Sequence, residues 1–238
     1  MQTSQIQPLP SLDEARPRTI TDQIFEVLYD RVVTLALPPG AKLSEAEVAA
    51  QMGVSRQPVR DAFFRLSQLG FIQIRPQRAT TVTPISEEAV LQAYFIRRAL
   101  EEAVMISAAA TLKAQDLDDL ALLIAQQDEA ISTGRPEVFH ALDDEFHHMI
   151  CARAGLDFVW SLVKDNKGHM DRARYLSLSY NGGTAVGEHR QILAALKARD
   201  PAAAAGAVHR HLSRIEHIIA RLHIDRPEVF AGTSEGTR

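Results

Sequence analysis

The sequence has only one cysteine, Cys151, and no apolar stretch near the roughly 18 to 20 residues that a membrane-spanning helix needs. A single cysteine cannot form an intrachain disulfide, which excludes the disulfide-stabilised secreted class and favours a reducing cytoplasm. Residues 1–18 are polar, contain several prolines and lack the apolar segment of a signal peptide, so we expect a flexible tail. The sequence therefore argues against a membrane protein and against a secreted one.

Charge and histidine are unevenly distributed along the chain. The net charge is only −4 over 238 residues, which excludes a protein coated with basic side chains. Between Val54 and Thr80, however, five arginines stand against one acid, whereas residues 86–238 carry 17 basic and 22 acidic side chains. All nine histidines lie between His140 and His223. The chain is therefore expected to contain two regions of different chemistry.

Residues 19–84 have the pattern of a small DNA-binding domain. Apolar residues recur at helical spacing in three segments, each followed by proline or glycine. Ser44 is expected to cap the second helix in a capping box with Glu47, and Ser55 to cap the third. Two short strands and a turn follow, over residues 71–75 and 80–83. This order of elements predicts a winged helix-turn-helix with three helices and a β-hairpin.

Residues 86–224 show only helical periodicity and form the second predicted domain, followed by a flexible tail over residues 225–238. Glycines and prolines separate the helical segments, and Asn181-Gly182-Gly183 is one of the expected breaks. Six helices are predicted, roughly over residues 86–110, 116–133, 136–153, 157–178, 185–198 and 201–224. The predicted fold class is mainly α, with a winged helix followed by an all-α bundle long enough to enclose a pocket.

The third N-terminal helix has a polar, basic face. Arg56 and Arg60 lie four residues apart and share this face with Gln57, while the apolar stripe turns away. Such a helix suits the major groove, where Arg can bond guanine and Gln can bond adenine. Ser55 offers a hydroxyl and free amides to a phosphate. Two hairpin arginines are expected to reach the flanking backbone or the minor groove: Arg75 and Arg78.

The segment from Leu43 contains G-V-S-R-Q-P-V-R-D-A-F-F-R-L and follows P-P-G. It resembles the winged helix of GntR-type bacterial repressors, whose pattern is close to G-V-S-R-x-P-V-R-x-A-L-x-x-L with a P-x-x-G wing. The resemblance implies DNA recognition by Ser55, Arg56, Gln57 and Arg60, with Arg78 in the wing. Two departures are Ala79 in place of the wing glycine, and Glu45-Ala46-Glu47 where some relatives have an arginine. We expect no base contact from that second helix.

Two acid–histidine pairs occur in the helix predicted over residues 136–153. Asp143 with His147, or Asp144 with His148, places a carboxylate one turn before an imidazole on the same face. Either pair could hold a metal, but the same spacing is common on solvated helices. The spacing alone therefore leaves both pairs, and an ordinary surface role, open.

Three segments with these residues, D-D-E-F-H, E-H-R-Q-I-L-A-A-L and D-P-A-A-A-A-G-A-V-H-R-H-L, resemble the ligand-binding domain of the FadR subfamily, called FCD. In that family D-x-x-F-H and two later histidines hold a metal. The resemblance implies the ligands Asp143, His147, His189 and His211. Phe146 sets this register, with Asp144 and His148 as the alternatives and His209 as the alternative to His211.

Three imidazoles and a carboxylate suit a divalent metal, with zinc as the first expectation and nickel, manganese or iron as alternatives. Open metal positions could bind a small carboxylate or hydroxy acid. By resemblance, Arg97 could pair with the carboxylate of such an effector, although a surface salt bridge with Glu101 is the alternative. Arg172 is a second candidate, with Arg174 beside it.

The sequence therefore predicts a DNA-binding transcription regulator, a repressor, that acts as a homodimer on a palindromic operator and responds to a small organic acid. An enzyme is not expected, because no acid outside the ligand set is marked as a general base. The alternatives are a metal-responsive regulator without an organic effector and, further behind, a metal-dependent hydrolase.

Overall fold

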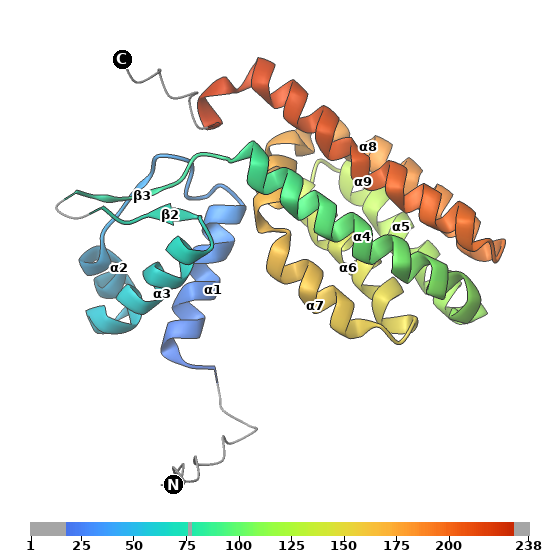
Figure 1. Ribbon diagram of the computed structural model, residues 1–238, viewed down its shortest axis with the longest axis horizontal. Helices are drawn as coiled ribbons and strands as arrows, with labels where there is room; N and C mark the ends of the chain where they lie inside the picture. Colours follow the sequence, from blue (N-terminus) through green and yellow to red (C-terminus); the bar gives the residue numbers. More distant parts are fainter. Residues whose placement is uncertain (1–17, 76–77, 231–238) are drawn as a thin grey trace, which may run out of the picture.

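The computed structural model describes residues 18–75 and 78–230, which form a small N-terminal lobe and a larger helical lobe (Figure 1). Each lobe is built around its own cluster of buried apolar side chains. No helix in the described part of the chain is long and apolar enough to cross a membrane. The predicted fold class, a winged helix followed by an all-α domain, is confirmed.

The N-terminal lobe contains α1 (Ile20–Val33), β1 (Lys42–Leu43), α2 (Glu45–Met52), α3 (Arg56–Gln68), β2 (Ile72–Gln73) and β3 (Thr80–Val82). Strand β3 lies between β1 and β2, and both pairings are antiparallel. The hairpin strands were predicted, but the two-residue β1 was not, because so short a segment has no periodicity. The amide of Glu47 donates to the side chain of Ser44 at 3.4 Å, which is one half of the predicted capping box; the returning bond from the Ser44 amide to the Glu47 carboxylate is not formed.

Helix α3 is fixed by its apolar face. Val59, Ala62, Phe63 and Leu66 are fully buried against α1 and the sheet, as their spacing predicted. Burying each of the three larger side chains, Val59, Phe63 and Leu66, stabilises the fold by about 1.5 to 3 kcal/mol. Because these four residues fix the rotation of α3, the opposite face of the helix is left on the surface of the lobe.

The helical lobe contains α4 (Glu87–Thr111), α5 (Ala114–Ser132), α6 (Pro136–Arg153), α7 (Asp157–Asn166), α8 (Gly168–Lys197), α9 (Pro201–Asp225) and the short η1 (Pro227–Val229). Helices α4, α8 and α9 pack against one another, while α5 and α6 pair on the other side of the core (Figure 1). Phe139, Phe146, Ile192 and Ile215 are among the buried core residues. This packing brings α6, α8 and α9 together inside the lobe.

The predicted helix break at Asn181-Gly182-Gly183 is wrong, because α8 runs through it without interruption. Two interior glycines cost a helix about 1 kcal/mol each relative to alanine. Residues on both sides of the break are buried, including Ala173, Val186 and Ile192, and this tertiary packing outweighs the cost. The chain breaks instead at Lys167, between α7 and α8, where a single glycine, Gly168, follows.

The start of α8 docks onto the winged helix. The His169 ring stacks on Phe71 at 4.3 Å, and its Nε2 donates to the carbonyl oxygen of Leu69 at 2.8 Å. Gly168 is needed here, since a Cβ at this position would lie 2.2 Å from the hydroxyl oxygen of Tyr29. Arg172 donates to the carbonyl oxygen of Thr83 at 2.6 Å. The first turns of α8 therefore connect the two lobes.

The end of the chain is less simple than the tail predicted over residues 225–238. Residues 227–229 form η1, and Val229 and Phe230 are buried. The amide of Ile85 donates to the carbonyl oxygen of Val229 at 2.8 Å. These residues therefore pack against the start of the helical lobe, and the remainder of the predicted tail, like residues 1–17, lies outside the described residues.

Candidate metal centre and nucleic-acid interface

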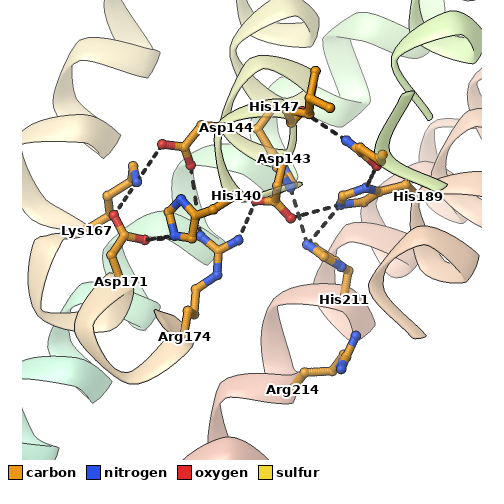
Figure 2. Close-up of polar contacts among 12 residues, drawn as sticks. His140, Asp143, Asp144, His147, Lys167, Asp171, Arg174, His189, His211 and Arg214 are labelled. Atoms are coloured by element: carbon orange, nitrogen blue, oxygen red, sulfur yellow. Dashed lines mark hydrogen bonds and ion pairs between the residues drawn. The ribbon is translucent and has the colours of Figure 1, made fainter. Parts of the chain in front are cut away.

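Four potential metal ligands meet in the middle of the helical lobe. Asp143 and His147 come from α6, His189 from α8 and His211 from α9, and all four side chains are buried. Their ligand atoms all lie within 4.8 Å of one another, and the side chains point toward a common centre (Figure 2). The helix packing therefore joins residues that are up to 68 positions apart in the sequence.

The three histidines face this centre with the same ring atom. Nε2 of His211 lies 3.3 Å from Nε2 of His147 and 3.3 Å from Nε2 of His189. Nε2 of His189 is 3.5 Å from Oδ1 of Asp143. Ligand atoms about 2.0 to 2.2 Å from one metal ion are separated by roughly 3.0 to 3.5 Å in tetrahedral or octahedral arrangements. The observed separations fit a single ion.

The other ring nitrogen of each histidine has an oxygen partner. Nδ1 of His147 lies 2.5 Å from Glu101, Nδ1 of His189 lies 2.7 Å from the amide oxygen of Gln127, and Nδ1 of His211 lies 3.0 Å from Glu188. The amide nitrogen of Gln127 donates to the carbonyl oxygen of Leu142, which fixes its orientation.

The contacts with Gln127 and Glu188 place the protons of His189 and His211 on Nδ1, and the carboxylate of Glu101 close to Nδ1 of His147 favours the same form there. The lone pair of each Nε2 is then directed to the centre. Three lone pairs cannot satisfy one another. Oδ1 of Asp143 is also buried there without a hydrogen bond. The residues present thus fit a cation that accepts all four ligand atoms.

The protonation states also suit a metal. Burial and the neighbouring histidines hold the pKa values of His189 and His211 well below the usual range. Burial alone would raise the pKa of Asp143, but Arg174 and the surrounding histidines hold it well below its usual range. Two neutral imidazoles and a carboxylate anion are the forms that bind a metal ion.

The alternative ligands lie outside the centre. Asp144 pairs with Lys167 at 2.8 Å, and His148 stacks on Trp160 and contacts Asp157 at 2.8 Å. His209 is exposed and contacts Glu102. The structure therefore brings together the ligand set implied by the FCD resemblance and leaves each of the alternatives in contact with a charged side chain elsewhere.

A cavity of about 50 Å³ adjoins the centre. Its lining combines Asp143 and His211 with three arginines and several apolar side chains: Arg97, Arg174, Arg214, Phe139, Met170, Leu212, Ile215 and Ile218. Nη2 of Arg174 lies 2.5 Å from Oδ2 of Asp143. This cavity is therefore lined by guanidinium groups and apolar side chains, with a metal ligand in its wall.

The two arginines predicted to bind an effector have different positions. Arg97 is fully buried, and its Nε donates to Glu101 at 2.6 Å, so the expected i to i+4 pair exists but is not on the surface. Nη1 and Nη2 of Arg97 have no hydrogen-bond partner among the described residues. Arg172 does not line the cavity, because its guanidinium binds the backbone that joins the two lobes. Its place beside the ligands is taken by Arg174.

The predicted DNA-recognition residues share the exposed face of α3. Ser55, Arg56, Gln57 and Arg60 are all exposed, and Ser55 stands at the helix N-terminus without a side-chain capping bond. Hairpin residues Arg75 and Arg78 are exposed as well. Ala79 is not among the described residues with positive φ, so the hairpin does not need a glycine at that position.

Sequence reasoning missed an acid beside these arginines. One carboxylate oxygen of Glu45, on α2, lies 3.4 Å from Arg56 and 3.3 Å from Arg60. Gln57 in turn donates to Asp61 at 2.9 Å. The partners of the metal-site histidines were missed for a similar reason, since Gln127 and Glu188 meet them only through packing. No sequence spacing indicates such contacts, although Glu188 does directly precede His189.

Two known families match the chain over most of its length. Residues 20–82 match the gntR family of bacterial regulatory proteins, and residues 92–214 match the FCD domain. The chain belongs to the GntR family. It is therefore a transcription regulator with a winged helix-turn-helix and an FCD domain, and not an enzyme.

Relatives of known name are regulators of this family. The chain is 34% identical over 214 residues to the HTH-type transcriptional repressor RspR of Escherichia coli strain K12, covering 89% of this chain and 94% of that protein. A probable D-xylose utilization operon transcriptional repressor of Paenarthrobacter nicotinovorans is 29% identical over 198 residues, covering 82% and 86%. The solved structure of E. coli McbR/YncC has a TM-score of 0.73 at 23% identity, covers 86% of this chain and 99% of that one, and shows the same fold.

Proposed function

We propose that this regulator is a repressor whose affinity for operator DNA is controlled by a small organic carboxylate bound beside a divalent metal ion. The observation that carries the proposal is the fully buried Arg97, whose two terminal nitrogens have no hydrogen-bond partner next to the Asp143 and histidine cluster. Guanidinium nitrogens that are buried without an acceptor are costly, and an entering carboxylate would accept from Nη1 and Nη2 of Arg97 while its Nε keeps Glu101. Two named relatives are repressors, which supports repression.

The metal would be held by Asp143, His147, His189 and His211, with zinc as the first candidate and nickel, manganese or iron as alternatives. A bound ion would supply a Lewis-acidic positive charge for an effector oxygen. The chain itself does three things: Glu101, Gln127 and Glu188 hold the imidazoles in place, Arg174 holds the second oxygen of Asp143, and Arg97 offers two free donors.

The size of the cavity limits the ligand. A volume of about 50 Å³ accommodates a few water molecules or a carboxylate group, but no large ligand. The remaining walls are apolar, with Leu212, Ile215 and Ile218 on α9. A short-chain organic acid fits this combination, with its carboxylate toward Arg97 and its carbon chain toward α9.

On the DNA side, the exposed face of α3 would enter the major groove, with Arg56 and Arg60 on base edges and Arg75 and Arg78 on the flanking backbone. One winged helix covers too few base pairs for specific binding, so a homodimer on a palindromic operator is part of the proposal. The effector and DNA must then affect each other's affinity reciprocally.

The test uses an operator selected from random duplexes by the full-length, metal-loaded protein. Operator binding is followed by fluorescence anisotropy with and without acetate, lactate, malate and citrate. For wild type, the effective acid should weaken binding about 5- to 150-fold, the usual range of such coupling. His147→Ala should bind the operator but ignore the acid, while the matched His148→Ala should respond as wild type does. Equal responses of both variants would place the effector elsewhere.

The small cavity also favours a second candidate, a regulator that responds to the metal ion alone. This function predicts that metal added to metal-free protein changes operator affinity fully and that no carboxylate adds to the change. Under the proposed function, metal alone should change operator affinity little, and the carboxylate added afterwards should produce the main change. Titrating the metal first and the acids second in the same anisotropy experiment therefore decides between the two.

A further inference from the structure

A ring of ion pairs joins α6 to the start of α8 beside the metal centre (Figure 2). This ion-pair ring consists of three acids and two bases: Asp143, Asp144, Asp171, Lys167 and Arg174. Lys167 and Asp171 are buried, with side-chain exposures of 5% and 4%. A packed apolar cluster would hold two helices together at least as well as buried ion pairs do. The charges in the ring therefore point to a role beyond packing.

The ion-pair ring begins at the candidate ligand Asp143. Oδ2 of Asp143 accepts from Nη2 of Arg174, and Nη1 of the same guanidinium donates to Oδ1 of Asp171 at 3.0 Å. Nζ of Lys167 pairs with Asp171 and, at 2.8 Å, with Oδ2 of Asp144. Asp144 directly follows Asp143 on α6, which closes the ring. One guanidinium thus connects a candidate metal ligand to the first turn of α8.

The same two turns of α8 hold the winged helix with other side chains. Gly168, His169 and Arg172 make the contacts with the winged helix described above, here called the interlobe contact. Tyr175 extends this contact, because its ring stacks on His140 at 4.2 Å and packs against the core of the winged helix. Residues of the ring and of the contact alternate within nine consecutive positions of the chain. A movement of one set therefore moves the other.

The interlobe contact and the ring are both incompletely bonded. Nδ1 of His169 and Nε of Arg172 are buried without a hydrogen-bond partner among the described residues. Each would regain water if the lobes separated, which favours opening. In the ring, Oδ1 of Asp144 is likewise buried without a hydrogen bond from the described part of the chain, and it lies 3.9 Å from Nη1 of Arg174. The ring can therefore tighten, and the contact can open.

The ion-pair ring has one negative charge in excess. Three carboxylates face two cations, and the adjacent His140 adds no charge at pH 7 because burial lowers its pKa to about 4. If a divalent ion is bound at the centre, Asp143 shares its charge with that ion. Arg174 is then held less by that carboxylate and more by Asp171 and Asp144, whose oxygens lie 3.0 and 3.9 Å from its Nη1. Occupancy of the centre should therefore strengthen the ring at the start of α8.

We propose that the ion-pair ring couples occupancy of the metal centre to the interlobe contact, with Lys167 and Asp171 as positioning residues that hold the start of α8 against the winged helix. The proposal rests on the metal site of the proposed function and adds the route from that site to the DNA-binding lobe. The interlobe contact is already formed in the structure, so occupancy should make its opening rarer and change operator affinity little. An entering carboxylate would compete for Arg174, which lines the cavity, and so loosen the ring.

Hydrogen exchange of the full-length protein, measured by mass spectrometry with and without zinc, tests the coupling. The amides of Leu69, Gly70 and Phe71 report the interlobe contact from the winged-helix side, because they lie against His169 and outside the ring. In wild type, zinc should slow their exchange about 5- to 150-fold, the usual range of coupling between two sites. The amides of α2, in the same lobe, are the internal control and should exchange at the same rate with and without zinc.

The decisive variant is Lys167→Met/Asp171→Asn, which removes one positive and one negative charge and so keeps the net charge of the ring. It should still bind zinc, as elemental analysis checks, but zinc should no longer slow exchange at residues 69–71. Lys167→Arg keeps the charge and should keep the effect. The matched control is Arg190→Met/Asp128→Asn, which removes an exposed ion pair between α8 and α5 and should behave as wild type.

The ratio of exchange rates with and without zinc separates coupling from a structural role. If the Lys167 and Asp171 pair were merely structural, its removal would speed exchange equally in both conditions and leave the ratio as in wild type. That result would overturn the proposal. An unchanged exchange rate in zinc-loaded wild type would overturn it as well, even if the double variant fails to fold.

The outcomes also separate this proposal from the proposed function. If wild type binds zinc without slower exchange at residues 69–71, the coupling is wrong and the metal site stands. If wild type binds no zinc, the metal site is wrong and the coupling is wrong with it. Neither result depends on the carboxylate titration, which tests the effector site independently.

Discussion

The two lobes place their polar side chains in opposite ways. In the winged helix, the residues expected to touch DNA are exposed, and their contacts with Glu45 and Asp61 are at the surface. In the helical lobe, charged residues such as Arg97, Glu101, Asp143 and Asp171 are almost fully buried. Among the described residues, every buried polar or charged side chain lies between Arg97 and His211.

This contrast indicates how each lobe can work. An exposed polar face keeps its water until DNA displaces it, so the winged helix can fold without its ligand. Buried charges are costly unless each has a partner, and at the metal centre some partners are incomplete. The helical lobe is therefore the part of the molecule whose stability should depend on ligand, pH and single polar residues.

The sharpest test of the contrast is removal of a buried acid. Glu101→Ala would leave Arg97 buried without its ion-pair partner and His147 without its Nδ1 contact, so unfolding free energy should fall by about 3 to 5 kcal/mol. Glu129→Ala, which removes the exposed pair with Arg135, should cost less than about 1 kcal/mol. Urea unfolding followed by circular dichroism measures both. Equal losses would contradict the contrast.

Acid should destabilise the helical lobe first. Burial, with the charge of Arg174, lowers the pKa of His140 to about 4, so native His140 stays neutral while unfolded His140 gains a proton below pH about 6.5. Its contribution to stability is complete above pH about 6.5 and is lost as pH falls toward 4, by up to about 1.4 kcal/mol per pH unit. His140→Phe should show a correspondingly shallower dependence in urea unfolding between pH 4.5 and 6, and the exposed His223→Phe should not.

The oxygen partners of the histidines should tune metal affinity. Gln127→Ala removes the acceptor for Nδ1 of His189, so zinc affinity should fall about 10- to 100-fold. The neighbouring Gln126 is exposed, and Gln126→Ala should bind zinc as wild type does. Competition with a chromophoric chelator measures both affinities. Unchanged zinc binding in the Gln127 variant would mean that the centre does not depend on its buried partners.

On the winged helix, single substitutions of exposed arginines should weaken DNA binding without changing the free energy of unfolding. Arg60→Ala should weaken operator binding by about 1 to 3 kcal/mol if Arg60 reads a guanine. The change should be much smaller on random duplex DNA, and Arg31→Ala, at an exposed residue of α1, should have little effect on either. Anisotropy with both duplexes makes the comparison. An equal loss on both duplexes would show that Arg60 contacts only phosphate.

The same contrast explains which features the sequence could predict. Helix α3 was predictable because its apolar stripe and its arginines alternate within 13 residues, so one local pattern fixes both faces. The ligands Asp143 and His147 share a local pattern too. By contrast, Gln127, Glu188 and Arg174 reach the centre only through the packing of α5, α6, α8 and α9, and packing also overrode the glycines inside α8.

Helix α8 joins the two lobes mechanically. At its N-terminal end, His169 contacts Phe71 and Leu69 of the winged helix. His189, a candidate metal ligand, lies 20 residues further along the same helix. That separation is a lever arm of about 30 Å. A tilt of only about 6° around His189 would displace the winged-helix end by about 3 Å, close to the 3.4 Å rise of one base pair. A ligand that tilts α8 slightly at His189 would thus displace the recognition helix α3 by about one base pair relative to the DNA.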